Sequence, residues 1–407
     1  MTAGPASRAY RRAVAVLFFA NGLGVATWYS NIPLVRATVG PDPLEQGAAL
    51  TGLGLGGLIG MPLAGRSRRL SGRGGAVTVI LVFGAALTGV GMARTREWLF
   101  AALLLLGIAN GLMVVVMNAH VIVVEEAGRR SLHARMYSFF GLGGITGAVL
   151  TAVLESAGVR PITHITGTGV LVVGLAGLVA PRLPADPTVV ARGRTRSTSP
   201  LRVPLLGVLA AIALFHQSTI ADWGGTYLVD EMGAGSSAAA LPYGCFAAGL
   251  LTGQLVGDLA ISRWGRWRTL GGGFVLAAVG LAQVVAATGV GLAAVGFAVS
   301  GLGAACAMPT VLGIAAREGG SRAETSMAFV ATAGHAATVA SPLAVGLVAR
   351  TSGLVAAFVA LAVALLIAGG HCSCHARRLT GTTPSQTRID PGDGPGSPVT
   401  PNSWRQP

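Results

Sequence analysis

Polar side chains inside otherwise apolar stretches are the residues of this sequence best suited to chemistry. Asn21, Asn110 and His335 lie near the middle of such stretches, counted at ~1.5 Å per helical residue from the nearest charged side chain. A polar group buried in a bilayer costs free energy, so these residues are candidates for function. Amides at this depth can hydrogen-bond a polar solute, and an imidazole can also exchange a proton.

Two titratable side chains are candidates for proton coupling. An unperturbed imidazole changes charge near pH ~6.5, which lets His335 respond to a physiological proton gradient. Asp222 lies ~30 Å along a helix from Arg202, which places it near the outer interface of a spanning helix. We predict that His335 and Asp222 couple solute movement to protons. The alternative role of His335 is a neutral hydrogen bond between helices.

Helical spacing sorts the side chains of the stretch 203–229 into two stripes. The first stripe consists of His216, Ile220, Trp223 and Tyr227. The second consists of Ser218, Thr219, Asp222 and Thr226. The imidazole and indole of the first stripe suit a small polar or partly aromatic solute, whereas the alternative is a set of helix–helix hydrogen bonds and interfacial aromatic rings.

The sequence contains no motif of an enzyme. It has no His-Glu-x-x-His, no Gly-x-Ser-x-Gly and no Walker loop. The run from His371 to His375, with Cys372 and Cys374 inside it, is too tight for a standard zinc site. A Cu(I) clamp or acylation of the cysteines are the alternatives for that run. We therefore expect no catalytic residue, no metal and no cofactor, and a process driven by a gradient rather than by a nucleotide.

The elements that position these residues follow from the composition. Of the 407 residues, 52% are hydrophobic and only 11% are charged, whereas soluble domains carry about a quarter charged residues. A soluble protein of this size is therefore excluded. A spanning helix needs ~20 apolar residues, and the chain offers twelve such stretches. They lie near 13–36, 46–65, 76–93, 98–124, 136–157, 162–180, 203–229, 238–259, 269–288, 291–316, 326–349 and 354–370.

The arginines between these stretches set the orientation. All 29 basic residues are Arg. If the N-terminus is cytoplasmic, 24 of them lie in inner segments and only five lie outside, namely Arg36, Arg94, Arg96, Arg160 and Arg350. The positive-inside rule then places both termini in the cytoplasm. The net charge of +14 thus reflects membrane topology, and no nucleic acid is expected as a partner.

The two halves of the chain repeat. Trp28 matches Trp223, and Gly56-xxx-Gly60 matches Gly249-xxx-Gly253, at nearly constant offsets of 195 and 193 residues. Six spans duplicated in parallel are typical of two-halved transporters. We expect four parts: an N-terminal six-helix bundle over 1–180, a cytoplasmic linker over 181–202, a C-terminal six-helix bundle over 203–370, and a disordered cytoplasmic tail over 371–407.

The break after the eighth stretch carries a recognisable motif. It reads Gly253-xxx-Gly257-Asp258-xxxx-Arg263-x-Gly265-Arg266-x-Arg268, which resembles the signature loop of the major facilitator superfamily. In that family the loop is thought to latch the cytoplasmic side shut, which implies a latch of Asp258, Arg263 and Arg266. An arginine cluster that serves topology alone is the alternative.

Three further segments narrow the resemblance. Those beginning at Asn21, Asn110 and Ala221 are similar to a bacterial branch of rhizopine-transport-like inner-membrane permeases. Related sequences carry acids where this chain has Gln217 and Val114. The resemblance implies an all-α fold of twelve transmembrane helices in two pseudo-symmetric six-helix bundles, with spans 1, 4, 7 and 10 around a central cavity. The substrate-binding residues expected on that basis are Asn21, Trp28, Asn110, His216, Gln217 and Trp223.

Together these features predict a secondary transporter in the cytoplasmic membrane. We expect a monomer in the lipid bilayer that moves a small molecule by alternating access, through proton-coupled export. Proton-coupled uptake of a small polar, sugar-like solute is one alternative. A membrane sensor on the same scaffold, which binds without transporting, is the other.

Overall fold

The chain is all-helical wherever its structure is described. The computed structural model describes residues 8–40, 42–66, 70, 72–128, 133–183, 203–319 and 323–381, and those residues contain no strand. Most of the predicted linker, from 184 to 202, and the predicted tail from 382 onward lie outside the described residues.

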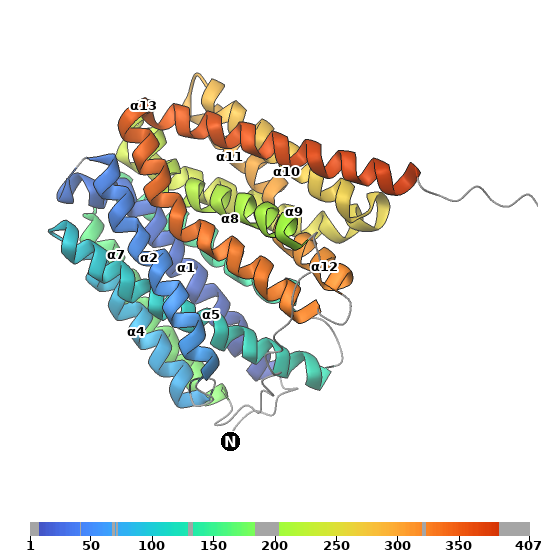
Figure 1. The fold of residues 1–407 in the computed structure, drawn as a ribbon. Helices are drawn as coiled ribbons and strands as arrows, with labels where there is room; N and C mark the ends of the chain where they lie inside the picture. The colour runs from blue at the N-terminus through green and yellow to red at the C-terminus, as the bar shows by residue number, and fades with distance from the viewer. Residues whose placement is uncertain are drawn as a thin grey trace, which may run out of the picture.

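The N-terminal lobe contains the first six spans (Figure 1). Capping residues set where its helices begin. The Asp42 carboxylate accepts hydrogen bonds from the backbone N–H groups of Leu44 and Glu45 at 2.9 and 3.1 Å, and so caps the start of the second helix. The helices are α1 (Arg8–Val39), α2 (Pro43–Arg66), α4 (Arg73–Gly91), α5 (Arg96–Gly128), α6 (His133–Ser156) and α7 (Pro161–Val179), followed by the short η1 (Ala180–Arg182).

The C-terminal lobe contains the other spans, and several of its helices are irregular. The tenth span breaks near Cys306 into α11 and α12, and the last helix turns at Gly353, whose φ of 84° is available to glycine without strain. The elements are α8 (Val203–Thr226), the π-helical η2 (Tyr227–Glu231), η3 (Ser236–Ala240), α9 (Leu241–Trp264), α10 (Arg266–Ala286), α11 (Val290–Ala304), α12 (Ala307–Gly319) and α13 (Ala323–Gly381).

The described residues contain 11 helical segments long and apolar enough to cross a membrane. The last of them, Thr325–Ala376, has 52 residues, which suffices for two crossings of ~20 residues each. Because α13 turns back at Gly353, it supplies the eleventh and twelfth predicted spans, as Figure 1 shows. The tail predicted to begin at residue 371 begins as helix instead, since α13 continues to Gly381.

The two lobes repeat the same packing. In the N-terminal lobe α1 packs on α6, α2 on α5, and α4 on α7; in the C-terminal lobe α8 packs on α13, α9 on α11, and α10 on α13. The predicted glycine repeats lie in equivalent contacts. A Cβ added to Gly56 would lie 2.2 Å from the Leu104 carbonyl oxygen, and one added to Gly249 would lie 2.0 Å from that of Ala298. These glycines let the helix backbones touch, as close packing in lipid requires.

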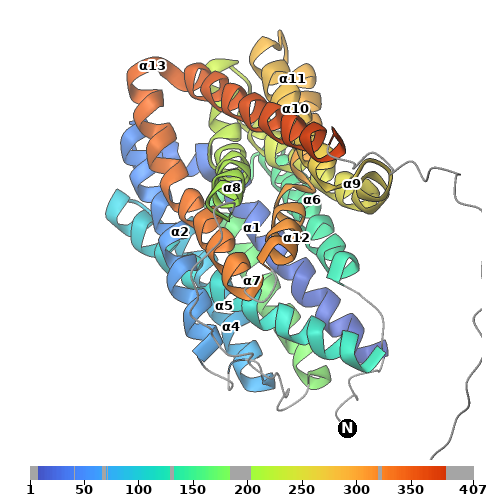
Figure 2. The same cartoon turned by 45° about the vertical axis from the view of Figure 1, so that its right-hand side comes forward.

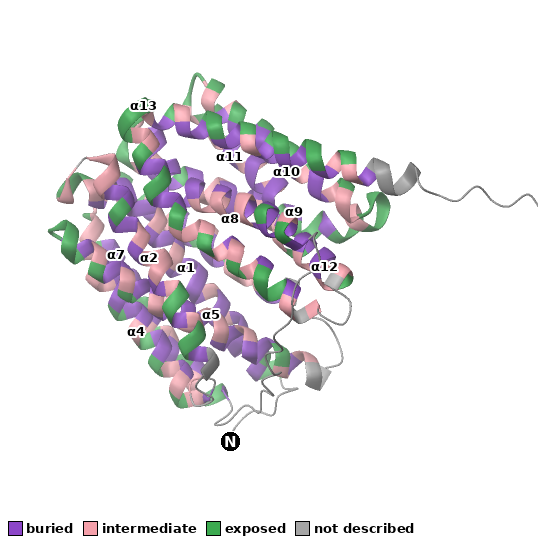
Figure 3. Ribbon diagram, in the orientation of Figure 1, coloured by how far each residue is buried: buried purple, intermediate pink, exposed green. Residues whose placement is uncertain are grey.

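The outer surface of the helices is rich in exposed apolar side chains, as expected for a protein in a bilayer. Large apolar side chains such as Leu255, Leu259 and Ile367 are 68 to 71% exposed on the outer surface. Figure 3 shows exposed positions along the outward faces of the helices and buried ones between them. Lipid tails are as apolar as these side chains, so an outward apolar surface costs nothing in a membrane.

The lobes meet at one end of the molecule. Across the boundary α2 packs on α13, α6 on α9, and α1 on α8. In Figures 1 and 2 the bundles converge at the end where α13 turns and diverge toward the end where α1 begins and α13 stops. We call the first the distal end and the second the terminal end.

Candidate functional site

A central cavity of about 520 Å³ lies between the two lobes. Helices of both lobes line it, and most of its wall is apolar. Its polar lining consists of Asn21, Tyr29, Asn110, Tyr137, Gln217, Ser218, Asp222, Tyr243, Gln254, His335 and Thr338. Sites for small molecules typically measure ~300–1,000 Å³ and combine apolar walls with a few polar groups, so this cavity is the candidate functional site.

An amide pair forms the polar wall of the N-terminal lobe. Asn21 on α1 donates its Nδ2–H to the Oδ1 of Asn110 on α5, at 2.7 Å. Each amide has two donor hydrogens and one acceptor oxygen, so the pair still offers the Asn21 oxygen and the Asn110 amino group. The structure therefore brings these two predicted residues together and presents both a donor and an acceptor to a solute.

A carboxylate faces the cavity from the opposite lobe. Asp222 on α8 is only 4% exposed, and Ser218, one turn earlier, donates its hydroxyl to the Asp222 Oδ2 at 2.8 Å. The same hydroxyl lies 3.4 Å from the Thr338 carbonyl oxygen of α13. Pro342, four residues later, has no N–H to bond that carbonyl, which leaves it free for a side-chain donor.

His335 also faces the cavity, from α13. Its Nδ1 lies 2.8 Å from the backbone oxygen of Ala331. A carbonyl oxygen can only accept, so Nδ1 carries the hydrogen and Nε2 is the nitrogen that can take up or release a proton. His335 and Asp222, the two predicted coupling residues, thus line one cavity from two helices of the same lobe.

Three predicted binding residues lie elsewhere. Trp28 and Trp223 are 1% and 0% exposed between helices, and neither lines the cavity. His216 is buried, with its Nε2 2.8 Å from the Ser300 hydroxyl of α11 and its ring against Phe246. The structure places this stripe of α8 away from the cavity, and the polar residues of α8 that line the cavity are Gln217, Ser218 and Asp222.

The repeat explains where His216 lies. Asn21 bonds Asn110 between the first and fourth spans, and His216 bonds Ser300 between the seventh and tenth. The two pairs are therefore equivalent polar contacts at similar offsets in the sequence. Only the pair in the N-terminal lobe opens onto the cavity, and the one in the C-terminal lobe is closed off by packing.

Polar contacts join the lobes at the distal end. Arg36 on α1 forms an ion pair with Asp230 of η2, and Arg350 on α13 lies 3.8 Å from Asp42 before α2. Gln46 of α2 donates to the Thr226 hydroxyl of α8 at 3.2 Å.

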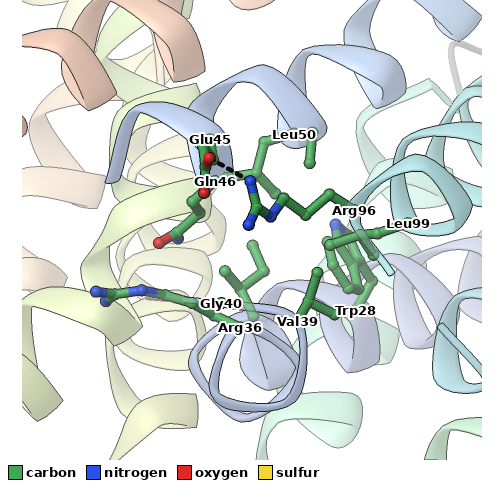
Figure 4. A pocket seen from close by; sticks show the side chains of 11 residues that line it. Trp28, Arg36, Val39, Gly40, Glu45, Gln46, Leu50, Arg96 and Leu99 are labelled. Atoms are coloured by element: carbon green, nitrogen blue, oxygen red, sulfur yellow. Dashed lines mark hydrogen bonds and ion pairs between the residues drawn. The ribbon is translucent and has the colours of Figure 1, made fainter. Parts of the chain in front are cut away.

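Beside these distal contacts lies a separate pocket of about 20 Å³, room for about one water molecule. Figure 4 shows it lined by Trp28, Arg36 and Gln46, with Arg96 bonded to Glu45 at its edge. Trp28 therefore belongs to the distal closure and not to the solute cavity.

The predicted latch is not engaged among the described residues. Asp258 and Arg263 are exposed at the terminal end. None of Asp258, Arg263 and Arg266 has a side-chain hydrogen bond or ion pair with another described residue. Gly265, with a φ of 80°, makes the turn between α9 and α10. An unlatched terminal end agrees with the divergence of the lobes there (Figure 2).

The Cys-containing run after the twelfth stretch lies in the last part of α13. Among the described residues no cluster of three or more His, Cys, Asp or Glu side chains could hold a metal ion. Cys372 is buried in helix packing, Cys374 is exposed, and the His375 ring packs on Trp267 with centroids 4.4 Å apart.

Some polar residues of the structure were not predicted. The rings of Tyr29 and Tyr243 contact each other across the boundary between the lobes, with centroids 5.0 Å apart and planes tilted by 32°. Away from the cavity, Asn31 contacts His164 and, at 3.4 Å, the Thr151 hydroxyl in a buried cluster. The spacing of Ser218 four residues before Asp222 could have indicated their hydrogen bond, whereas the other contacts join distant segments and leave no local signal.

The fold defines a class of protein: a polytopic integral membrane transporter of two six-span lobes around a central cavity. The chain belongs to the Major Facilitator Superfamily, whose sequence profile it matches over residues 14–334. It is accordingly a transporter and not an enzyme.

Relatives and solved structures agree with this assignment. The chain is 30% identical over 359 residues to an uncharacterized MFS-type transporter of Yersinia pestis, covering 86% of this chain and 91% of that protein. It is 26% identical over 350 residues to the membrane protein MosC of Rhizobium meliloti, covering 84% of each.

Among solved structures, the nucleoside transporter NupG (D323A mutant) superposes with a TM-score of 0.72 at 13% identity, covering 91% of this chain and 99% of that one. A bacterial homolog of the lysosomal transporter Spinster, inward-facing and unoccupied, gives 0.67 at 14% identity, covering 92% and 98%.

Proposed function

We propose that this protein exports a small polar solute across the cytoplasmic membrane in exchange for protons. The observation that carries the proposal is the juxtaposition in one cavity of a carboxylate, an imidazole and an amide pair, contributed by Asp222, His335 and Asn21 with Asn110. The first two can hold a proton, and the amides supply hydrogen bonds to a solute that carries no proton. Proton binding and solute binding then take place in one cavity, which opens alternately to the two sides of the membrane.

The arginine distribution supports an orientation with both termini in the cytoplasm. In that orientation the distal end faces outward and is closed, and the terminal end faces the cytoplasm. The described conformation is then the one that receives solute from inside the cell, which is the loading state of an exporter. The protein acts as a monomer in this proposal, since the cavity is complete within one chain.

Ser218 links the proton site on α8 to α13, the helix of the same lobe that contacts α2 of the other lobe. A hydroxyl has one hydrogen, so it bonds either the Asp222 carboxylate or the Thr338 carbonyl oxygen. When Asp222 is protonated, its own hydrogen can bond the Ser218 oxygen and release the serine hydrogen toward α13. Because α13 packs on α2 at the distal end, a change at the acid alters the contact between the lobes.

Proton flux in proteoliposomes tests the proposal. Vesicles that contain a pH-sensitive dye are mixed with fractions of a cell extract, and a solute-dependent pH change identifies both substrate and coupling. Asp222→Asn should abolish the proton signal, whereas Glu155→Gln, a neutralisation outside the cavity, should keep it. Solute flux without any proton signal would contradict proton coupling. Solute binding without flux would favour the alternative of a membrane sensor.

The direction of transport needs a separate measurement. Uptake of a sugar-like solute uses the same cavity and differs only in the gradient that drives it. A proton gradient directed into right-side-out vesicles should drive loss of a preloaded solute in the exporter and accumulation in an uptake permease.

A further inference from the structure

The charges around the cavity carry information about the solute. The described lining contains one carboxylate, Asp222, and no arginine. Arg36, a cation at the distal boundary, is engaged by Asp230. A buried carboxylate is costly unless a proton, a cation or several hydrogen bonds compensate it, and the Ser218 hydroxyl is the one side-chain donor that the structure gives it.

The other polar groups that line the described part of this cavity supply no permanent positive charge. Tyr29 of α1 and Tyr243 of α9 present phenol groups, Thr338 of α13 a hydroxyl, and His335 of α13 an imidazole whose Nδ1 is already bonded to its own helix. A bound anion would add a like charge to this environment, which is unfavourable at low dielectric. A bound cation would supply the missing partner, and aromatic rings favour cations as well.

We infer that the transported solute is a small hydrophilic organic cation, whose ammonium pairs with Asp222 while its polar groups bond the Asn21–Asn110 pair. The inference rests on the proposed function and specifies its substrate. The amide pair offers an acceptor and a donor, and Gln217 adds another amide on the opposite wall. Hydroxyl or amide groups on the solute fit these partners, whereas a purely apolar cation leaves them unsatisfied.

This site also accounts for exchange. A proton and an ammonium group cannot both neutralise the same carboxylate, so binding of the solute cation releases the proton of Asp222 to the side from which the solute came. On the other side, a proton that arrives at Asp222 releases the cation. One acid thus alternates between two positive partners, and no bond other than O–H is made or broken.

Three probes with one carbon skeleton test the charge of the solute. Glucamine, sorbitol and gluconate differ in carrying an ammonium, no charge or a carboxylate. The thermal unfolding midpoint of the purified full-length protein in detergent is measured with each at equal concentration. Glucamine should raise the midpoint most, sorbitol less and gluconate not at all. The response to glucamine should also weaken as the pH is lowered, since protons then compete for Asp222.

Variants separate the charge pairing from general stabilisation. Asp222→Asn should weaken glucamine binding by about ten- to a hundredfold, the loss expected for a hydrogen bond to a charged group. Glu155→Gln should leave that binding unchanged. An equal response to sorbitol or gluconate, or no response to glucamine, would overturn the inference.

Proton flux measured with the same three probes keeps the two proposals apart. Flux driven by gluconate or sorbitol leaves the transporter in place but contradicts a cationic solute. Binding of glucamine without any proton flux leaves the cation site in place but contradicts proton exchange.

Discussion

Asp222 and His335 differ in what their surroundings allow them to do. Asp222 is almost fully enclosed and has a single hydroxyl donor, so its charge is decided by whatever positive partner is present. His335 lines the cavity, and its ring is held at Nδ1 by a backbone oxygen of its own helix. The first is therefore suited to exchange one cation for another, and the second to pass protons between the cavity and water.

We predict that His335→Gln keeps solute binding but reduces the dependence of flux on a pH gradient. Glutamine retains a side-chain donor for the Ala331 oxygen and cannot take up a proton, so the wall of the cavity is preserved while titration is lost. Solute affinity and proton-driven flux are measured on the same proteoliposome preparation. A His335→Gln protein that still concentrates solute with a pH gradient alone would leave Asp222 as the sole coupling residue.

The equivalent residues Asn21 and His216 should respond in opposite ways to truncation. Asn21→Ala removes a cavity amide and should lower solute affinity by about threefold to tenfold, the equivalent of ~0.5–1.5 kcal/mol for one hydrogen bond. His216→Ala removes a buried ring that bonds Ser300 and packs on Phe246. It should lower the unfolding midpoint with little change in affinity. Loss of affinity in His216→Ala would contradict the cavity described above.

Sequence periodicity could predict the stripes of α8 but not the orientation of the helix. The first stripe mixes polar and apolar side chains, the second is entirely polar, and both are largely buried. The first packs inside the lobe, whereas Ser218 and Asp222 of the second line the cavity. Choosing between them requires knowing which helices lie on each side. Asn21, Asn110 and His335 were placed at the middle of the membrane by depth, and all three line the cavity. Depth placed Asp222 near the outer interface and the family resemblance pointed to Gln217, yet both line the same cavity. The indole rings of Trp28 and Trp223 were predicted to bind solute because of their chemistry, but both are buried between helices.

At the scale of elements, the spans were predictable because lipid imposes a length and an apolar composition on each helix. The irregular positions were not. The break of the tenth span near Cys306 and the π-helical turns of η2 depend on tertiary contacts rather than on local composition. The helical start of the tail shows the converse, since apolar residues such as Cys372 and Ala376 are buried beyond the expected end of the span.

The contact between α2 and α13 is the element on which distal closure depends. A Cβ at Gly47 would lie 2.4 Å from the Pro342 carbonyl oxygen, and one at Gly346 would lie 2.6 Å from that of Pro43. Backbone atoms cannot yield to such an overlap as a flexible side chain would. The two helices can therefore close only because these positions carry no side chain.

We predict that Gly47→Ala favours the state that is open at the distal end. One methyl group in this contact should cost the closed state about 1–3 kcal/mol, the usual penalty for overpacking. A single cysteine at the cavity position Val25, in a variant without the four native cysteines, reports access from the distal side to an impermeant maleimide.

Labelling at that reporter should be faster in Gly47→Ala than in the parent protein. Gly167→Ala serves as the control, because a Cβ at Gly167 meets nothing within 4 Å. Equal labelling in both variants would show that α2 and α13 do not limit distal opening.

At the scale of the whole molecule, the two lobes must exchange states whose free energies differ little, since both states take part in every cycle. The distal contacts suit that requirement. Asp230 and Asp42 are 41% and 35% exposed in their ion pairs, and pairs exposed to water contribute only ~0.2–1 kcal/mol each. These ion pairs align the two lobes in the closed state but are too weak to make distal closure irreversible.

We predict that these ion pairs make distal closure sensitive to salt. Arg36→Ala combined with Arg350→Ala removes both cations from the contacts with Asp230 and Asp42, and should speed distal labelling of the Val25 cysteine severalfold. High ionic strength screens exposed charges, so salt should speed labelling in the parent protein and have little effect in the double variant.

Arg94→Ala removes an exposed arginine for which the structure gives no ion pair with a described residue, and should behave as the parent. Equal salt dependence in the parent and the double variant would show that Arg36 and Arg350 do not hold the lobes together, and would leave closure to the packing of α2 on α13.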